Sequence, residues 1–169
     1  MGGYLSSFGG WICQSGFARA SSGNVIENCT NNGDIRVVNN QSGCGGIAGA
    51  FLCANVINCT NNGNIDLQSG GGVAGQYAGE NAIIEVTFTN CVNNGNILSY
   101  YSGGICGSSS GGTTSLRLNF INCTNNGIIQ GRYGGGIQGS GGLIPIKDGP
   151  KYTSLTDCKN YGNIVETYA

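Results

Sequence analysis

Apolar residues alternate with polar ones over short stretches of this chain, and Gly, Asn and Ser interrupt the alternation at regular intervals. In the middle of the sequence, Ile84, Val86 and Phe88 alternate with charged and hydroxyl residues. A period of two is typical of a half-buried β-strand, whereas a helix needs apolar residues three and four positions apart. Each of the many glycines would also cost a helix about 1 kcal/mol. The pattern therefore predicts short strands separated by turns.

A motif of the form Asn-Cys-x-Asn-Asn-Gly-x-Ile recurs through the sequence, with a more divergent last copy that begins Asp-Cys-Lys-Asn. Its five cysteines are Cys29, Cys59, Cys91, Cys123 and Cys158, and its isoleucines are Ile35, Ile65, Ile97, Ile129 and Ile164. The cysteines are 30, 32, 32 and 35 residues apart. A second motif, Gly-Gly-Ile-x-Gly, alternates with the first at 45–49, 71–75, 103–107 and 135–139, and 9–12 is a degenerate copy. The chain thus consists of units of about thirty residues.

Units of this length stack as coils, each pairing its backbone with the coils on either side. We therefore predict an all-β fold, a parallel β-helix (β-solenoid) of about five coils with roughly 30 residues and three short strands per coil. The strands are expected after the Gly-Gly, before the Asn-Cys and at the isoleucine that follows the Asn-Gly. The recurring isoleucines then form one inner column, and Ile26, Val56, Phe88, Phe120 and Leu155 form another.

The whole chain, 1–169, is expected to form a single solenoid domain. Residues 1–8 form an N-terminal edge segment, and 9–139 form the regular coils. Residues 140–169 are expected to form a C-terminal capping coil, because both prolines and six of the fifteen charged residues lie there. Proline and charge discourage pairing at an open sheet edge. The N-terminal edge is aromatic and almost uncharged, so it is the end where we expect a partner.

Columns of identical polar residues follow from the same alignment. Asn32, Asn62, Asn94 and Asn126 suit turns, where each amide can bond to the copy one coil away. The glycine that follows each is expected to adopt positive φ. Two charged pairs also fall in register, and they are Arg36 over Asp66 and Glu85 over Arg117. We expect these to be inter-coil ion pairs, each worth less than about 1 kcal/mol.

Nine cysteines are an odd number, so at least one thiol is unpaired within the chain. Parallel side chains in one column have poor geometry for disulfides, which favours a column of small buried thiols. A metal-binding row is the weaker alternative, because no Cys-x-x-Cys pair or histidine accompanies it. Strict alternation would instead place the neighbouring asparagine inside. A bend must therefore intervene, and the sequence leaves open which column is buried.

Composition excludes several classes of function. Charged residues make up 9% of the chain and the net charge is −1, so an electrostatic nucleic-acid binder is excluded. Histidine is absent, so no imidazole can act as a base or bind a metal. The best carboxylate cluster, Glu27, Asp34 and Asp66 around Arg36, is interpreted as a solvated surface. We predict no catalytic residues, cofactor or metal, no transmembrane segment and no signal peptide.

The two alternating motifs resemble the GLUG-motif repeats of surface proteins and adhesins, best seen in Gly71-Gly72-Val73-Ala74-Gly75 and in 56–65. The likeness covers about 9–165 and, more distantly, extends to polymorphic outer-membrane proteins. It implies a parallel β-helix on a cell or particle surface.

The expected function is that of a non-enzymatic structural or adhesive β-solenoid presenting a repeated polar surface to a protein or glycan. Its expected location is extracellular, on a cell surface or on a virus particle. One alternative is a virus-particle or fibre subunit that self-associates through a solenoid end. A carbohydrate-active β-helix enzyme is the third.

Overall fold

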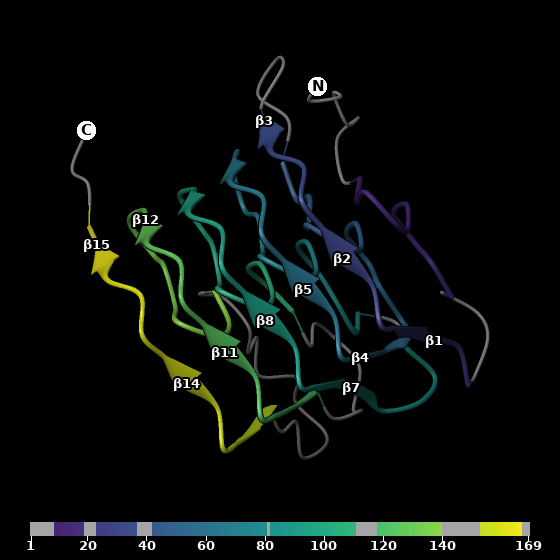
Figure 1. Ribbon diagram of the computed structural model, residues 1–169. Helices are drawn as coiled ribbons and strands as arrows, with labels where there is room; N and C mark the ends of the chain where they lie inside the picture. The colour runs from purple at the N-terminus through teal and green to yellow at the C-terminus, as the bar shows by residue number, and fades with distance from the viewer. Residues whose placement is uncertain are drawn as a thin grey trace, which may run out of the picture.

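The computed structural model describes residues 9–18, 23–36, 42–80, 82–110, 118–139 and 153–166. Within these ranges the protein contains strands and turns but no helix. The strands form three parallel sheets of five strands each, and every strand pairs with the equivalent strand of the next coil. Figure 1 shows the coils side by side in chain order, from purple to yellow. The predicted β-solenoid is therefore confirmed, with about four full turns between its first and last strands.

Each sheet collects one strand from every coil. The first contains β1 (Val25–Glu27), β4 (Asn55–Ile57), β7 (Val86–Thr89), β10 (Leu118–Ile121) and β13 (Thr153–Thr156). The second contains β2 (Thr30–Asn31), β5 (Thr60–Asn61), β8 (Val92–Asn93), β11 (Thr124–Asn125) and β14 (Lys159–Asn160). The third contains β3 (Ile35–Arg36), β6 (Ile65–Asp66), β9 (Ile97–Leu98), β12 (Ile129–Gln130) and β15 (Ile164–Val165).

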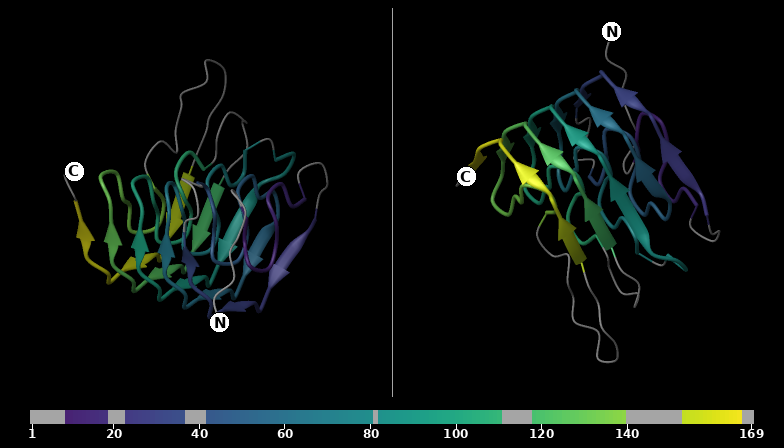
Figure 2. Two further views of the ribbon diagram at one scale, coloured as in Figure 1. Left: turned by 90° about the horizontal axis from the view of Figure 1, so that it is seen from above. Right: turned by 60° about the horizontal axis from the view of Figure 1, so that its bottom comes forward.

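The Gly-Gly-Ile segments close the fourth side of each coil without forming a strand. They pair through single parallel bridges, such as Gly45 with Gly71 and Ala48 with Ala74. The prediction of a strand after each Gly-Gly is therefore wrong, and the third strand of a coil lies after the cysteine instead. Glycine is needed at these positions because a Cβ on Gly45 would overlap the backbone of Ala74. Figure 2 shows this side of the coils as turns facing the strands.

Two apolar clusters fill the inside of the coils. The larger stacks Val56, Phe88 and Phe120 in register, and the two phenylalanine rings lie parallel with centroids 5.2 Å apart. The smaller stacks the repeated isoleucines, of which Ile65 and Ile97 are fully buried. Burial of such a side chain stabilises the fold by about 1.5–3 kcal/mol. The alternation seen in the sequence thus separates the inner residues from the outer ones.

A sharp bend precedes each of the five cysteines of the repeated motif. The residue before it has positive φ in every coil, and these residues are Asn28, Asn58, Asn90, Asn122 and Asp157, with φ of 52–55°. Asparagine tolerates this left-handed conformation better than most residues. The bend interrupts the alternation, so the asparagine points outward and the cysteine inward. This resolves the question of which of these two columns is buried.

The glycines after the paired asparagines serve a different purpose from the one predicted. Gly63, Gly95, Gly127 and Gly162 do not have positive φ, so that expectation is wrong. A Cβ on any of them would overlap the carbonyl oxygen of the equivalent glycine one coil earlier. Close backbone approach, rather than a left-handed turn, therefore requires glycine here.

The two ends of the solenoid differ in exposure. In the first coil Ile35 is 2% exposed, and the indole Nε1 of Trp11 donates to the carbonyl of Gly33 at 3.1 Å. In the last coil Ile164 is 50% exposed and Leu155 is 53% exposed. Among the described residues the isoleucine column is therefore covered at its N-terminal end and open at its C-terminal end, although Ile12 in the first coil is itself 48% exposed. Trp11 contributes to the cover over Ile35, because it replaces the second glycine of the motif and packs against the isoleucine cluster.

Some sequence predictions fall outside the described residues. They include the edge segment 1–8, the proline- and charge-rich part of the expected capping coil at 140–152, and Arg117.

Candidate functional site

The outward side of the second sheet carries two rows of exposed asparagines. In the row predicted from the sequence, Asn62, Asn94 and Asn126 each donate through Nδ2 to the Oδ1 of the preceding copy, starting at Asn32, over 2.7–2.8 Å. In a second row the bend residues Asn58, Asn90 and Asn122 do the same, starting at Asn28, over 2.8–3.2 Å. Each amide keeps one N–H for an outside partner.

A row of mostly hydroxyl side chains lies between these asparagines, namely Thr30, Thr60, Val92, Thr124 and Lys159. We call the three rows together the polar face. Over its first four coils the polar face contains no charged residue. Apart from Val92 and, in the last coil, Lys159, it is an array of amides and hydroxyls repeating about every 4.8 Å along the solenoid axis.

A third asparagine row lies inside the solenoid and was not predicted. It consists of Asn31, Asn61, Asn93, Asn125 and Asn160, of which the first four are buried. Each Nδ2 donates to the carbonyl of the glycine two residues on, at 2.8 Å, and the first four also donate to the next asparagine Oδ1 at 2.7–2.8 Å. The buried amides therefore donate toward the C-terminal end, whereas the exposed rows donate toward the N-terminal end. Every buried amide is satisfied, as interior polar groups require.

The cysteine column lies beside this row. Cys59, Cys91 and Cys123 are buried, Cys29 and Cys158 are partly buried, and all nine cysteines are free thiols. The Cys91 thiol approaches the carbonyls of Val56 in the preceding coil and Thr89 in its own, at 3.4 and 3.5 Å. Burial raises the pKa of the Cys59 thiol to about 11. A thiol with a raised pKa is a poor nucleophile at neutral pH, so Cys59 contributes packing.

One of the two ion pairs predicted from the sequence does not form, and the other involves a residue outside the described ranges. Strand pairing places Arg36 beside Asp66, but the Arg36 guanidinium contacts Asp34 of its own coil instead, at 3.4 Å. Asp34 lies two residues away on the same strand face, which makes it the nearer partner. Glu85 accepts a hydrogen bond from the Asn119 side chain at 3.5 Å, while its predicted partner lies outside the described residues. The inter-coil ion pair at Arg36 is therefore not formed.

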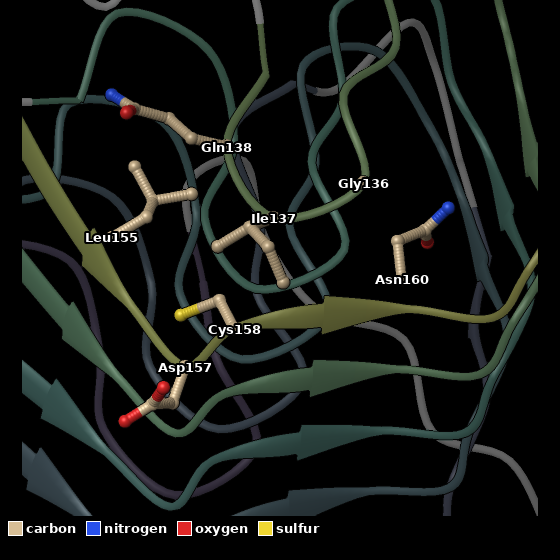
Figure 3. Close-up of a pocket in the computed structure, with 7 residues that line it drawn as sticks. All are labelled: Gly136, Ile137, Gln138, Leu155, Asp157, Cys158 and Asn160. Atoms are coloured by element: carbon tan, nitrogen blue, oxygen red, sulfur yellow. The ribbon is translucent and has the colours of Figure 1, made fainter.

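A pocket of about 560 Å³ opens at the C-terminal end of the solenoid. It is lined by Gly136, Ile137, Gln138, Leu155, Asp157, Cys158 and Asn160. Figure 3 shows Ile137 and Cys158 on its inner side and the carboxylate of Asp157 pointing away from them. The buried asparagine row ends here at Asn160, and burial raises the pKa of the Cys158 thiol. This pocket is the exposed interior of the last coil, with apolar and amide groups where a further coil would pack.

An exposed aromatic cluster lies where the chain leaves the third sheet. Tyr100 and Tyr101 follow β9, and Arg132 and Tyr133 occupy the equivalent positions after β12. The rings of Tyr101 and Tyr133 stack with centroids 5.0 Å apart. We call these four residues the tyrosine–arginine cluster. Aligning the units 32 residues apart brings Tyr101 and Tyr133 into one column, so the sequence does contain a signal for this aromatic pair.

Neither a metal-binding cluster nor a membrane-spanning helix is found among the described residues. No group of three or more Cys, Asp or Glu side chains there is arranged to hold a metal ion. No helix with the length and hydrophobicity of a membrane span occurs in those residues. Comparison with protein families, curated proteins and solved structures gives no match.

Proposed function

We propose that the protein is a non-enzymatic structural or adhesive β-solenoid whose polar face contacts a neutral glycan or protein at a cell or particle surface. The observation that carries this proposal is the polar face itself. Its rows hold amides and hydroxyls at fixed spacing, and hydrogen bonds between neighbouring amides keep the side chains of both asparagine rows in place. Side chains that are already ordered lose little entropy when a ligand binds.

The distribution of charge also supports this proposal. An uncharged face repels neither neutral nor weakly charged partners, so recognition there depends on hydrogen bonding and shape. The exposed carboxylate cluster anticipated from the sequence has its arginine engaged by Asp34, at 3.4 Å. The polar face is therefore a better candidate for binding a partner than the carboxylate cluster is for acid–base chemistry.

A glycan array probed with the folded protein tests this function. Thr124→Lys places a cation in the central row of the polar face, in the fourth coil beside Lys159, and Gln130→Lys makes the same change on the outward side of the third sheet. We expect Thr124→Lys to weaken binding at least tenfold and Gln130→Lys to leave it unchanged. Bound glycans should keep their mass after incubation. Release of shortened glycans, or equal effects of the two variants, would contradict the proposal.

Self-association through the C-terminal end is the alternative, and the exposure of Leu155 and Ile164 favours it. Both residues belong to inner columns, so they leave apolar surface in water at this end. Strands β13, β14 and β15 also have a described partner on only one side. Unpaired strand edges of this kind readily pair with another chain.

Light scattering over a concentration series separates the two functions. If the end is a docking surface, mass should increase with concentration, and Leu155→Lys should return the protein to a monomer. Ile121→Lys is the matched control, because Ile121 is 40% exposed on the outward side of β10, one strand in from the end strand β13. A monomer at all concentrations would refute the self-association alternative.

A further inference from the structure

The tyrosine–arginine cluster has the composition of a recognition site. It follows the strands of the third sheet, whereas the polar face lies on the second sheet. Tyr100, Tyr101 and Tyr133 are 36%, 41% and 42% exposed. The rings of Tyr101 and Tyr133 are nearly parallel, at 9°, and Tyr100 is tilted by 48° against Tyr101 with centroids 6.0 Å apart. Tyrosine and arginine are enriched where proteins bind partners, because each offers a large contact area with a polar tip. The fold itself does not require these rings at the surface.

The guanidinium of Arg132 lies close to an aromatic ring and has no ion pair among the described residues. Its Cζ lies 5.4 Å from the centroid of the Tyr133 ring, a cation–π distance. Arg36 is neutralised by Asp34, but in the described part of the chain no ion pair involves Arg132. A guanidinium stacked on an aromatic ring retains N–H donors in its plane, and these match a carboxylate in two-point contact. The cluster thus offers an anion site next to aromatic surface.

The backbone beneath the cluster is fixed. The amide of Tyr133 donates to the carbonyl of Tyr100 at 3.0 Å. Ser99 is buried, where its hydroxyl accepts from the amide of Gly70 at 3.2 Å. A Cβ on Gly131 would overlap the Ser99 carbonyl, so the two coils are in close contact here. Side chains on such a rigid support bind without first having to be ordered.

We propose that the tyrosine–arginine cluster binds a glycan that carries carboxylates, such as a polymer of uronic acids. The tyrosine rings suit the C–H faces of pyranose rings, their hydroxyls suit sugar hydroxyls, and Arg132 pairs with the carboxylate. This site goes beyond the proposed polar-face function and uses separate residues.

An acidic peptide is the competing ligand, and the backbone argues against it. One common mode of peptide binding adds a strand to an open sheet edge. Around the cluster the amides are already bonded to neighbouring coils, including Ser99 to Gln130 at 2.9 Å and Gly131 to Val165 at 3.0 Å. The site therefore offers side chains alone, as a glycan requires.

Calorimetric titration with galacturonic acid oligomers tests the proposal, with neutral galactose oligomers of the same length as comparison. We expect the acidic oligomers to bind at least tenfold more tightly at low salt, and the preference to fade as salt screens the exposed charge. Arg132→Gln should abolish the preference, and Tyr133→Leu should weaken binding of both oligomers. Arg36→Gln is the matched control and should change neither.

Three results would overturn the assignment. Equal affinity for acidic and neutral oligomers, or an unchanged preference in Arg132→Gln with its thermal unfolding intact, would remove the role of the guanidinium. Equally tight binding of a polyglutamate peptide would assign the site to peptides instead. Thr124→Lys should leave acidic-oligomer binding unchanged, so this test is independent of the polar face.

Discussion

The carbonyl oxygen of Gly63 occupies the place where a Cβ on Gly95 would lie. We therefore expect Gly95→Ala to force the third and second coils apart and to lower the free energy of unfolding by more than about 2 kcal/mol. Gly33→Ala is the matched control in the same column. Among the described residues no earlier coil lies against Gly33, and a Cβ there would make ordinary contacts with the Trp11 indole at 3.4 Å and the Asn31 Oδ1 at 3.5 Å. Urea unfolding followed by circular dichroism should show a loss in Gly95→Ala alone, and equal losses would refute the steric explanation.

The buried asparagine row should matter far more to stability than the exposed one. Asn93 accepts from Asn61 and donates to Gly95 and Asn125 at 2.7–2.8 Å. Asn93→Ala would leave these buried groups unpaired, at about 1–3 kcal/mol each. We expect a loss of about 3 kcal/mol or more, measured by thermal and urea unfolding.

Its neighbour provides the control. Asn94 belongs to the exposed row, where water can replace the lost partners. Asn94→Ala should therefore cost less than about 1 kcal/mol. Similar losses in the two variants would mean that the inner amides are not essential to the stack.

Repetition made the architecture predictable, because one alignment of the units fixes the register of every sheet. The stacking of Ile65 on Ile97, and of Arg36 beside Asp66, could be read from the sequence in this way. The inner asparagine row could not. Alternation predicts which side chains face inward only until a left-handed residue intervenes, and Asn28 with φ of 55° resets the pattern before β2.

The candidate sites were less predictable than the fold, since they depend on interactions between single residues. The register of the strands places Arg36 and Asp66 side by side, yet the Arg36 guanidinium contacts Asp34 instead. The cover over the isoleucine column at its N-terminal end also depends on one side chain, because Trp11 stands where the other copies of the motif have glycine. Periodicity describes what the coils share, whereas both ends and the tyrosine–arginine cluster depend on residues that depart from it.

The isoleucine column should tolerate no charge. Ile97 is fully buried between Ile65 and Ile129, and Ile97→Asp would place an unpaired carboxylate there. We expect loss of cooperative thermal unfolding. Gln130→Asp introduces the same side chain at an exposed position on the adjacent strand and should keep the wild-type transition. A normal melt for Ile97→Asp would contradict the inward orientation of this column.

Buried thiols should make the fold sensitive to alkali. Desolvation raises the pKa of the Cys106 thiol well above its ordinary value of 9.0 and that of Cys59 to about 11. Between pH 9 and 11 the unfolded chain therefore loses these protons while the folded chain retains them. The free energy of unfolding therefore keeps its full value below about pH 9 and decreases above it, by about 1.4 kcal/mol per pH unit for each such thiol.

Cys106→Ala isolates one contribution to this loss. Ala48 and Ala74 occupy the same column in earlier coils, so alanine fits the site. Urea unfolding from pH 8 to 11 should give a shallower decline for Cys106→Ala than for the wild type, with similar stability at pH 8. The Cys106 thiol stays protonated in the folded state, so its removal takes away its share of the pH dependence of the free energy of unfolding. An identical slope in both proteins would mean that the Cys106 thiol ionises as readily in the folded protein as in the unfolded chain.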